Sequence, residues 1–105
     1  MRTTTQTSPL RAVADRNIPG LPAALGALAQ ALGRELELAV LPAAVIDAAA
    51  VRQAELLFVR STVRVGPALL AGSAVRLVAT ATIGTDHLDL PWLAAQGIHA
   101  ASAPN

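Results

Sequence analysis

Short runs of β-branched and other apolar residues alternate along this chain with alanine- and leucine-rich stretches, and glycine or proline separates most of them. A short apolar run bounded by such breakers is typical of a strand, whereas apolar residues three and four apart are typical of a helix. Strands that alternate with helices predict β-α units around a parallel sheet. The predicted strands are Leu10–Ala14, Leu36–Val40, Leu56–Val59, Val75–Ala79 and Ile98–Ala100.

The stretch Ala23–Leu32 has the strongest helical pattern. Pro22 suits the first turn of this helix, and Gly33 suits its end. Its apolar residues at helical spacing are Leu25, Leu28 and Leu32. Asp89, Pro91 and Gly97 likewise mark the cap, first turn and end of the last helix. The other predicted helices are Asp47–Arg52, Gly66–Ala71 and Leu90–Gln96.

Two of the predicted strands, at 56–59 and 77–79, are continuously apolar rather than alternating. This pattern is expected for parallel strands that helices cover on both faces. We therefore predict an α/β fold, a flavodoxin-like open parallel sheet with helices on both faces, in a single domain of residues 9–105. Residues 1–8 are predicted to form a flexible N-terminal arm.

The composition supports a folded domain and excludes several classes of function. Hydrophobic residues make up 53% of the 105-residue chain and charged residues 14%, which is too apolar for a disordered segment. All eight basic residues are arginines, spread from Arg2 to Arg76 without a cluster, so we expect no nucleic-acid binding. The apolar stretches are too often interrupted to cross a membrane. The absence of cysteine excludes disulfides and thiolate metal sites and suits a cytoplasmic protein.

Polar loops follow the predicted strands where ligands bind in such sheets, beyond the carboxyl ends. The loop Arg60–Arg64 offers two guanidinium groups and two hydroxyl groups, a combination suited to a carboxylate or phosphate. The alternative is that Ser61 or Thr62 caps backbone N–H groups while the arginines face solvent.

The densest polar patch of the sequence is Thr80–Asp89. Its three threonines and Gly84 would allow a small polar ligand to approach the backbone closely. Equally, Asp86 and Asp89 could cap a helix and His87 could bond within a turn. His87 suggests a metal site or a Ser-His-Asp hydrolase only weakly, because further histidine ligands and a G-x-S-x-G turn are absent. The glycines never stand two apart, so no G-x-G-x-x-G nucleotide loop exists in this chain.

Several segments together resemble a known family. The segment Leu57–Ser61 reads L-F-V-R-S, Leu77–Asp89 reads L-V-A-T-A-T-I-G-T-D-H-L-D, and Gln96–Ile98 reads Q-G-I. Over residues 55–104 this pattern is similar to the 4-phosphoerythronate dehydrogenase family, a branch of the D-2-hydroxyacid dehydrogenases. Related phosphoglycerate dehydrogenases typically have R-A-G-x-G-x-D-N-I-D in place of T-A-T-I-G-T-D-H-L-D.

Upstream, the segment Val13–Pro19 is similar to the family's opening V-D-E-N-x-P. The chain departs from the family's pattern at three positions. Arg16 replaces the usual acid, Ala79 replaces a glycine near a strand end, and Asn105 replaces the glycine that normally follows the proline.

The resemblance implies the N-terminal, substrate-binding part of an NAD-dependent oxidoreductase that acts in pyridoxal 5'-phosphate (vitamin B6) biosynthesis. The family oxidises 4-phospho-D-erythronate to the 2-oxo-3-hydroxy-4-phospho acid, and its members are cytoplasmic homodimers. The family's two substrate-binding hydroxyl residues correspond here to Ser61 and Thr82. Its catalytic residues and its glycine-rich NAD loop are expected beyond residue 105, so no catalytic, cofactor-binding or metal-ligating residue is assigned, and His87 is not the family's catalytic histidine.

A stand-alone, non-catalytic α/β module that binds a small anion or a partner protein is the alternative interpretation. The coding DNA downstream of Asn105 would distinguish the two, because a continuing reading frame with G-x-G-x-x-G supports the oxidoreductase.

Overall fold

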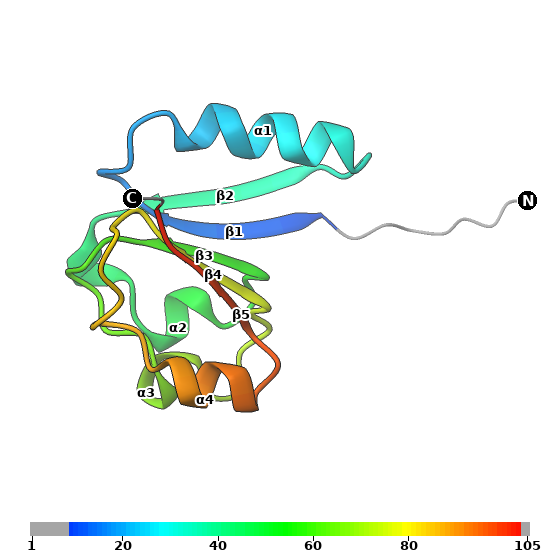
Figure 1. Cartoon of the computed structure of the whole chain (residues 1–105). Coiled ribbons are helices and arrows are strands. Elements are labelled where there is room, and N and C mark those ends of the chain that lie inside the picture. Colours follow the sequence, from blue (N-terminus) through cyan, green and yellow to red (C-terminus); the bar gives the residue numbers. More distant parts are fainter. Residues whose placement is uncertain (1–8, 104–105) are drawn as a thin grey trace, which may run out of the picture.

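The computed structural model describes residues 9–103. Five parallel strands form one sheet in the order β2-β1-β3-β4-β5 (Figure 1). This is the flavodoxin-like strand order, so the predicted fold class is confirmed. The strands are β1 (Leu10–Asp15), β2 (Leu36–Leu41), β3 (Leu56–Val59), β4 (Leu77–Thr80) and β5 (His99–Ala101). The helices are α1 (Leu21–Ala31), α2 (Ala48–Val51), α3 (Pro67–Leu70) and α4 (Leu90–Ala95). The proposed arm at residues 1–8 lies outside the described residues.

The strand β4 begins two residues later than the sequence predicts. Leu77 is the first residue of β4 in register with β3, whose own first residue is Leu56. Val75 therefore has no strand partner, and its N–H group donates to the Ser73 hydroxyl instead. A short 3-10 turn at Ala43–Val45 follows Pro42 and was not predicted.

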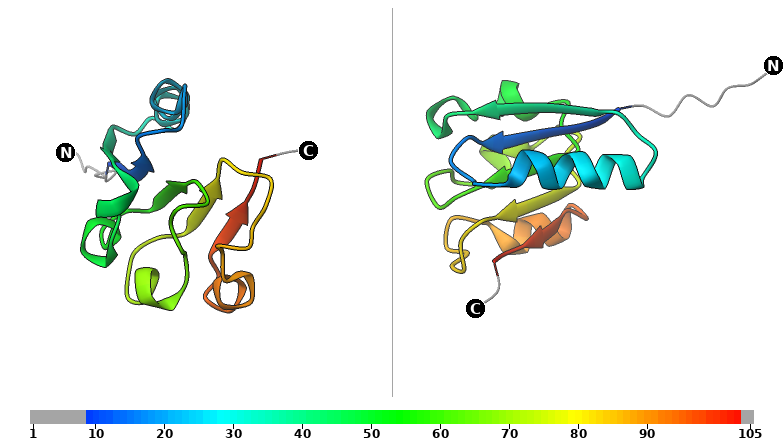
Figure 2. Two further views of the ribbon diagram at one scale, coloured as in Figure 1. Left: turned by 90° about the vertical axis from the view of Figure 1, so that its left-hand side faces the viewer. Right: turned by 90° about the horizontal axis from the view of Figure 1, so that it is seen from above.

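The helices divide unequally between the two faces of the sheet. Figures 1 and 2 show α1 on one face and α2, α3 and α4 on the other. The main core lies between the sheet and these three helices, where side chains of both the strands and the helices are buried. Its central members are Val13, Val51, Leu57, Val59, Leu70, Val78 and Leu93.

The face that carries α1 is only partly covered in the described part of the chain. Leu57 and Val78 are buried under α2–α4, whereas Phe58 and Ala79, which point the other way, are half-buried. The expectation that helices cover both faces of β3 and β4 is therefore wrong. Among the strands, α1 packs mainly on β2, and an apolar hollow of about 240 Å³ remains between its first residue, Leu21, and the side chains of Phe58 and Ala79.

The helix α1 buries a narrower stripe than its leucines suggest. Leu25 and Ala29 are buried, one helical turn apart. Leu28 and Leu32, which share the helical spacing of Leu25, are 42% and 53% exposed and lie outside the buried stripe. Because α1 lies over the edge of the sheet, it buries only the side chains that point straight down. No helix among residues 9–103 is long and apolar enough to cross a membrane.

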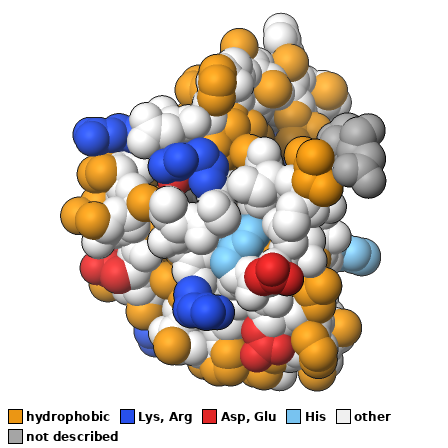
Figure 3. All heavy atoms as spheres, turned by 60° about the vertical axis from the view of Figure 1, so that its left-hand side comes forward, with side chains coloured by type: hydrophobic (Ala, Val, Ile, Leu, Met, Phe, Trp, Pro, Cys, Tyr) orange, Lys and Arg blue, Asp and Glu red, His pale blue; other side chains and the backbone are white. Residues whose placement is uncertain are grey.

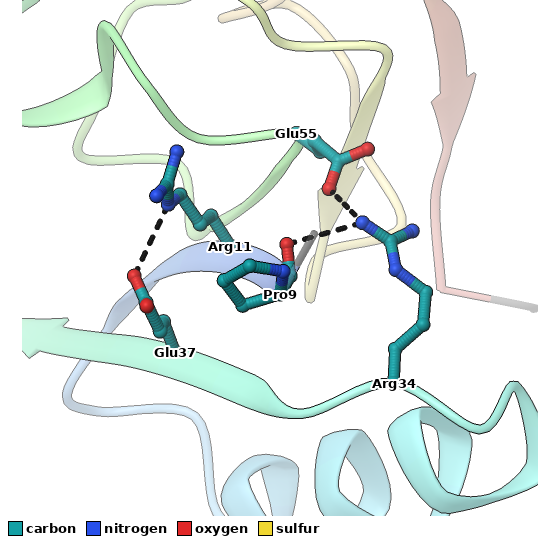
Figure 4. A network of polar contacts seen from close by, with 5 residues as sticks. All are labelled: Pro9, Arg11, Arg34, Glu37 and Glu55. Carbon is teal, nitrogen blue, oxygen red and sulfur yellow. Dashed lines mark hydrogen bonds and ion pairs between the residues drawn. The ribbon is translucent and has the colours of Figure 1, made fainter. Parts of the chain in front are cut away.

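Ion pairs hold the amino edge of the sheet (Figure 4). The Arg34 guanidinium donates to the Glu55 carboxylate at 2.7 Å and to the Pro9 carbonyl at 3.1 Å, which ties together the starts of β1, β2 and β3. Arg11 and Glu37 are register partners in β1 and β2, and their side chains pair at 3.1 Å. Arg11 and Arg34 thus form ion pairs within the fold and do not belong to an open basic face.

Candidate functional site

The candidate site lies at the carboxyl edge of the sheet. Val59 and Thr80 are paired at the ends of β3 and β4, and the Ala81 N–H group donates to the Val59 carbonyl. Ser61 and Thr82 each follow two residues later, so both loops leave the same edge, as the sequence predicts. Figure 3 turns this edge toward the viewer and shows a histidine side chain with acidic and basic side chains around it.

The two loops are fastened to each other. Val65 and Leu88 form an isolated parallel bridge, in which the Val65 N–H group donates to the His87 carbonyl at 2.8 Å. The Asp89 N–H group donates back to the Val65 carbonyl at 2.8 Å, and the Asp89 carboxylate caps α4 by accepting from the Trp92 N–H group. The capping interpretation of Asp89 is therefore correct. These bonds fix the position of Ser61's loop relative to Thr82's loop.

Asp15 and Arg60 form an ion pair between the ends of β1 and β3. The Asp15 side chain is fully buried, accepts from the Asn17 N–H group at 2.8 Å and pairs with the Arg60 guanidinium at 3.2 Å. Arg60 therefore has a partner inside the fold, and it does not simply face solvent. The sequence places Asp15 at the end of an apolar strand, but no pattern in the sequence identifies Arg60 as its partner.

A chain of hydrogen bonds runs behind the loop of Thr82. The Thr80 hydroxyl lies 2.7 Å from the Thr82 hydroxyl and 2.9 Å from Nε2 of His87. The Thr82 hydroxyl donates to the Gly84 carbonyl at 2.9 Å. Thr80 is 4% exposed and His87 is 8% exposed, so water does not compete for these groups. His87 thus bonds to a side chain of the strand rather than within its own turn.

A small open hollow of about 240 Å³ joins the two loops. It is lined by Ser61, Arg64, Asp86 and His87. Arg64 and Ser61 are exposed, and the Ser61 hydroxyl makes no hydrogen bond to any residue in the described range 9–103. The hollow therefore presents a free hydroxyl and a guanidinium to solvent, a pair of donors suited to an anionic group.

Burial governs the charge of His87. It lowers the pKa of the imidazole below the ordinary value, the Asp86 carboxylate opposes this shift, and the Arg64 guanidinium reinforces it. The imidazole is therefore neutral near pH 7. A neutral ring beside Arg64 leaves that arginine as the cation of the hollow.

The described residues do not fit NAD. The turn from β1 into α1 reads D-R-N-I-P-G over Asp15–Gly20 and lacks the glycines that let a backbone approach a pyrophosphate. The buried Asp15 carboxylate and Arg60 also pair at the switch point between β1 and β3, where a nucleotide would lie in a dinucleotide-binding fold. No step of NAD chemistry is therefore placed on these residues.

Comparison with known proteins identifies relatives of this chain. The family model of the D-isomer specific 2-hydroxyacid dehydrogenase catalytic domain matches residues 21–105. Erythronate-4-phosphate dehydrogenase of Chromohalobacter salexigens is 50% identical over 96 residues, which cover 90% of this chain and 23% of that protein. Erythronate-4-phosphate dehydrogenase of Pseudomonas putida (strain W619) is 49% identical over 92 residues, which cover 88% of this chain and 22% of that protein.

The fold also matches a solved structure. D-lactate dehydrogenase of Aquifex aeolicus, complexed with NAD and lactic acid, superposes with a TM-score of 0.64 at 20% identity, covering 89% of this chain and 28% of that chain. At this identity the likeness shows the fold alone. The chain spans less than a quarter of the length of the curated relatives named above. The match over residues 21–105 covers most of the sequence, and the chain therefore belongs to the D-isomer specific 2-hydroxyacid dehydrogenase family.

Proposed function

We propose that this chain is the substrate-binding part of an NAD-dependent dehydrogenase that oxidises 4-phospho-D-erythronate at its C2 hydroxyl. The product would be the 2-oxo-3-hydroxy-4-phospho acid, an intermediate on the way to pyridoxal 5'-phosphate. The relatives at 49% and 50% identity are erythronate-4-phosphate dehydrogenases, which supports this substrate over other 2-hydroxy acids. A cytoplasmic location and a homodimer remain part of the proposal.

The observation that carries the proposal is the meeting of two loops at one sheet edge. Ser61 offers a free hydroxyl group beside the Arg64 guanidinium, and Thr82 lies on the next loop, joined to the same hollow through Thr80 and His87. Hydroxyl and guanidinium donors together suit a substrate with a carboxylate, hydroxyls and a phosphate. Hydride transfer to NAD is assigned to segments of the relatives that this chain does not cover.

A chimera tests this function. Residues 9–103 would replace the matched segment of the Pseudomonas putida relative, with which the chain shares 49% identity. We expect the chimera to oxidise 4-phospho-D-erythronate with NAD. Ser61→Ala should lower kcat/KM by about tenfold to a hundredfold, because a hydrogen bond to a charged substrate group is worth about 1.5 to 3 kcal/mol. Thr82→Ala should lower it by about threefold to tenfold, the effect expected of a hydrogen bond between uncharged groups.

Thr62→Ala is the matched control, since Thr62 is an exposed hydroxyl residue beside Ser61 and lies outside the hollow. Its kcat/KM should equal that of the unmutated chimera. The KM for NAD should stay constant in all variants, which separates a site effect from loss of folding. An active chimera that tolerates both alanine substitutions, or that prefers 3-phosphoglycerate, contradicts the proposed function.

A further inference from the structure

The hydrogen bonds behind Thr82 have only one consistent direction. A hydroxyl group carries a single hydrogen, and the Gly84 carbonyl can only accept, so the Thr82 hydrogen is used at Gly84. Thr80 must then be the donor in its bond to Thr82. With its own hydrogen used, Thr80 accepts from His87, so Nε2 of His87 carries a proton. His87 therefore donates to Thr80, Thr80 donates to Thr82, and Thr82 donates to the Gly84 carbonyl.

This direction decides what Thr82 offers to a ligand. Its hydrogen is committed, and one of its two lone pairs receives the hydrogen of Thr80. The remaining lone pair accepts a hydrogen bond, and a carboxylate or phosphate oxygen has no hydrogen to give. To bind such an oxygen, Thr82 would have to break its bond to Gly84. A hydroxyl group of the substrate can donate to Thr82 without breaking either of these bonds.

We infer that Thr80 and His87 are positioning residues that hold Thr82 as an acceptor for a hydroxyl group of the substrate. The anionic end of the substrate then belongs to the Ser61 hydroxyl and the Arg64 guanidinium, which are free to donate. This inference rests on the proposed function. It adds which end of the sugar acid each loop takes, and it gives the two buried side chains a role.

The burial of the two positioning residues makes their effect specific. Thr80 belongs to β4 and His87 is held at its carbonyl by the Val65 N–H group, so both groups are fixed by the backbone on either side. The bond between His87 and Thr80 is buried and the bond between Thr80 and Thr82 is partly buried, and linked hydrogen bonds polarise one another, which strengthens the orientation of Thr82. Valine has the shape of threonine without the hydroxyl, so Thr80→Val removes the bonds with little change of volume.

The first measurement is the tautomer of His87 in the full 105-residue chain. Long-range ¹H–¹⁵N correlation spectra at neutral pH should show Nε2 protonated and Nδ1 unprotonated. Thr80→Ser should preserve this pattern because serine retains the hydroxyl. A ring protonated on Nδ1 alone would reverse the direction of the bonds and overturn the inference.

The second measurement compares two ligands by NMR titration of the same chain. One ligand is 4-phospho-D-erythronate, and the other is 4-phosphobutanoate, which has the same anionic ends and no hydroxyls. Thr82→Val and Thr80→Val should weaken binding of 4-phospho-D-erythronate by about threefold to tenfold and leave 4-phosphobutanoate unchanged. Thr80→Ser, which keeps the hydroxyl that Thr80→Val removes, should bind 4-phospho-D-erythronate as tightly as the unmutated chain. Ser61→Ala should weaken both ligands alike, and Thr85→Val, on the same loop as Thr82, should change neither.

The outcomes separate this inference from the proposed function. If Thr82→Val weakens both ligands equally, or if Thr80→Val binds like the unmutated chain, the inference is overturned while the substrate site stands. If neither Ser61→Ala nor Thr82→Val affects either ligand, or if the unmutated chain binds neither, the proposed site itself is wrong, and the inference falls with it.

Discussion

The guanidinium of Arg60 lies 3.2 Å from a carboxylate oxygen of Asp15, whose side chain is fully shielded from solvent. Arg64, four residues along the same loop, is exposed beside Ser61. A buried carboxylate needs a partner, because water cannot replace the lost hydrogen bonds. An exposed guanidinium has no such constraint and remains available to a ligand. The two arginines of one loop therefore differ: Arg60 pairs within the fold, and Arg64 is the one that the proposed site would use.

This difference predicts opposite results for two equivalent substitutions. Arg60→Gln should lower the free energy of unfolding by about 1 to 2 kcal/mol, because it leaves the Asp15 carboxylate underpaired while solvent still reaches part of the site. Arg64→Gln should change it by less than about 0.5 kcal/mol. Urea unfolding followed by circular dichroism measures both. Equal stability of the two variants would show that the Asp15 pair contributes nothing measurable.

At the same scale, the sequence predicts the position of some residues of the candidate site and misses that of others. Ser61 and Thr82 follow apolar strands at the same distance, and parallel strands bring such positions to one edge, so their place at the same edge was predictable. Thr80 reads as the last residue of a strand, and His87 reads as a loop residue seven positions away. Their bond depends on how the loop folds back over β4. No spacing rule specifies that path.

Two helices end in the same way, which shows how glycine fixes element boundaries. At α1, the Gly33 N–H group donates to the Gln30 carbonyl and the Arg34 N–H group to the Ala29 carbonyl. At α4, Gly97 and Ile98 repeat this pattern on Ala94 and Leu93. Both glycines have positive φ angles, 67° and 72°. This is the Schellman arrangement, in which glycine avoids the strain of a left-handed conformation.

Two alanine substitutions in the region of α1 test this account. Gly33→Ala should lower the free energy of unfolding by about 1 to 2 kcal/mol, because alanine is strained at positive φ although no atom obstructs its methyl group. Gly26→Ala, inside the same helix and equally unobstructed, should raise it by up to about 1 kcal/mol. Thermal unfolding compares the two variants directly. Destabilisation of both would mean that steric crowding, rather than backbone conformation, controls these positions.

Proline and glycine therefore made the helix ends predictable, whereas burial was harder to predict. The leucines at 28 and 32 have helical spacing but remain exposed, and Phe58 and Ala79 are apolar but only half-buried. An apolar pattern marks positions that suit burial. Which of them are covered depends on where each helix lies across the sheet, and α1 packs mainly on β2.

At the scale of the whole molecule, the strand order reverses between β1 and β3, and ligands of open parallel sheets bind at such a switch point. In this protein the Asp15–Arg60 pair lies at that switch point. The free donors lie one strand further along, between the loops of β3 and β4. The donors of the described residues thus suit a small polar acid better than a dinucleotide.

This arrangement predicts that the 105-residue chain by itself does not bind NAD measurably. Tight dinucleotide binding needs a glycine-rich turn before a helix, an acidic ribose partner some 20 residues later, and an open crevice at the switch point. The chain has none of these glycines at the required spacing, and the buried Asp15 carboxylate pairs with Arg60 at the switch point between β1 and β3. Calorimetric titration with NAD should give no heat beyond dilution, while the chimera with the Pseudomonas putida relative, titrated in the same buffer, provides the positive control. Micromolar binding by the 105-residue chain would mean that its loops form a nucleotide site by some route other than a glycine-rich turn.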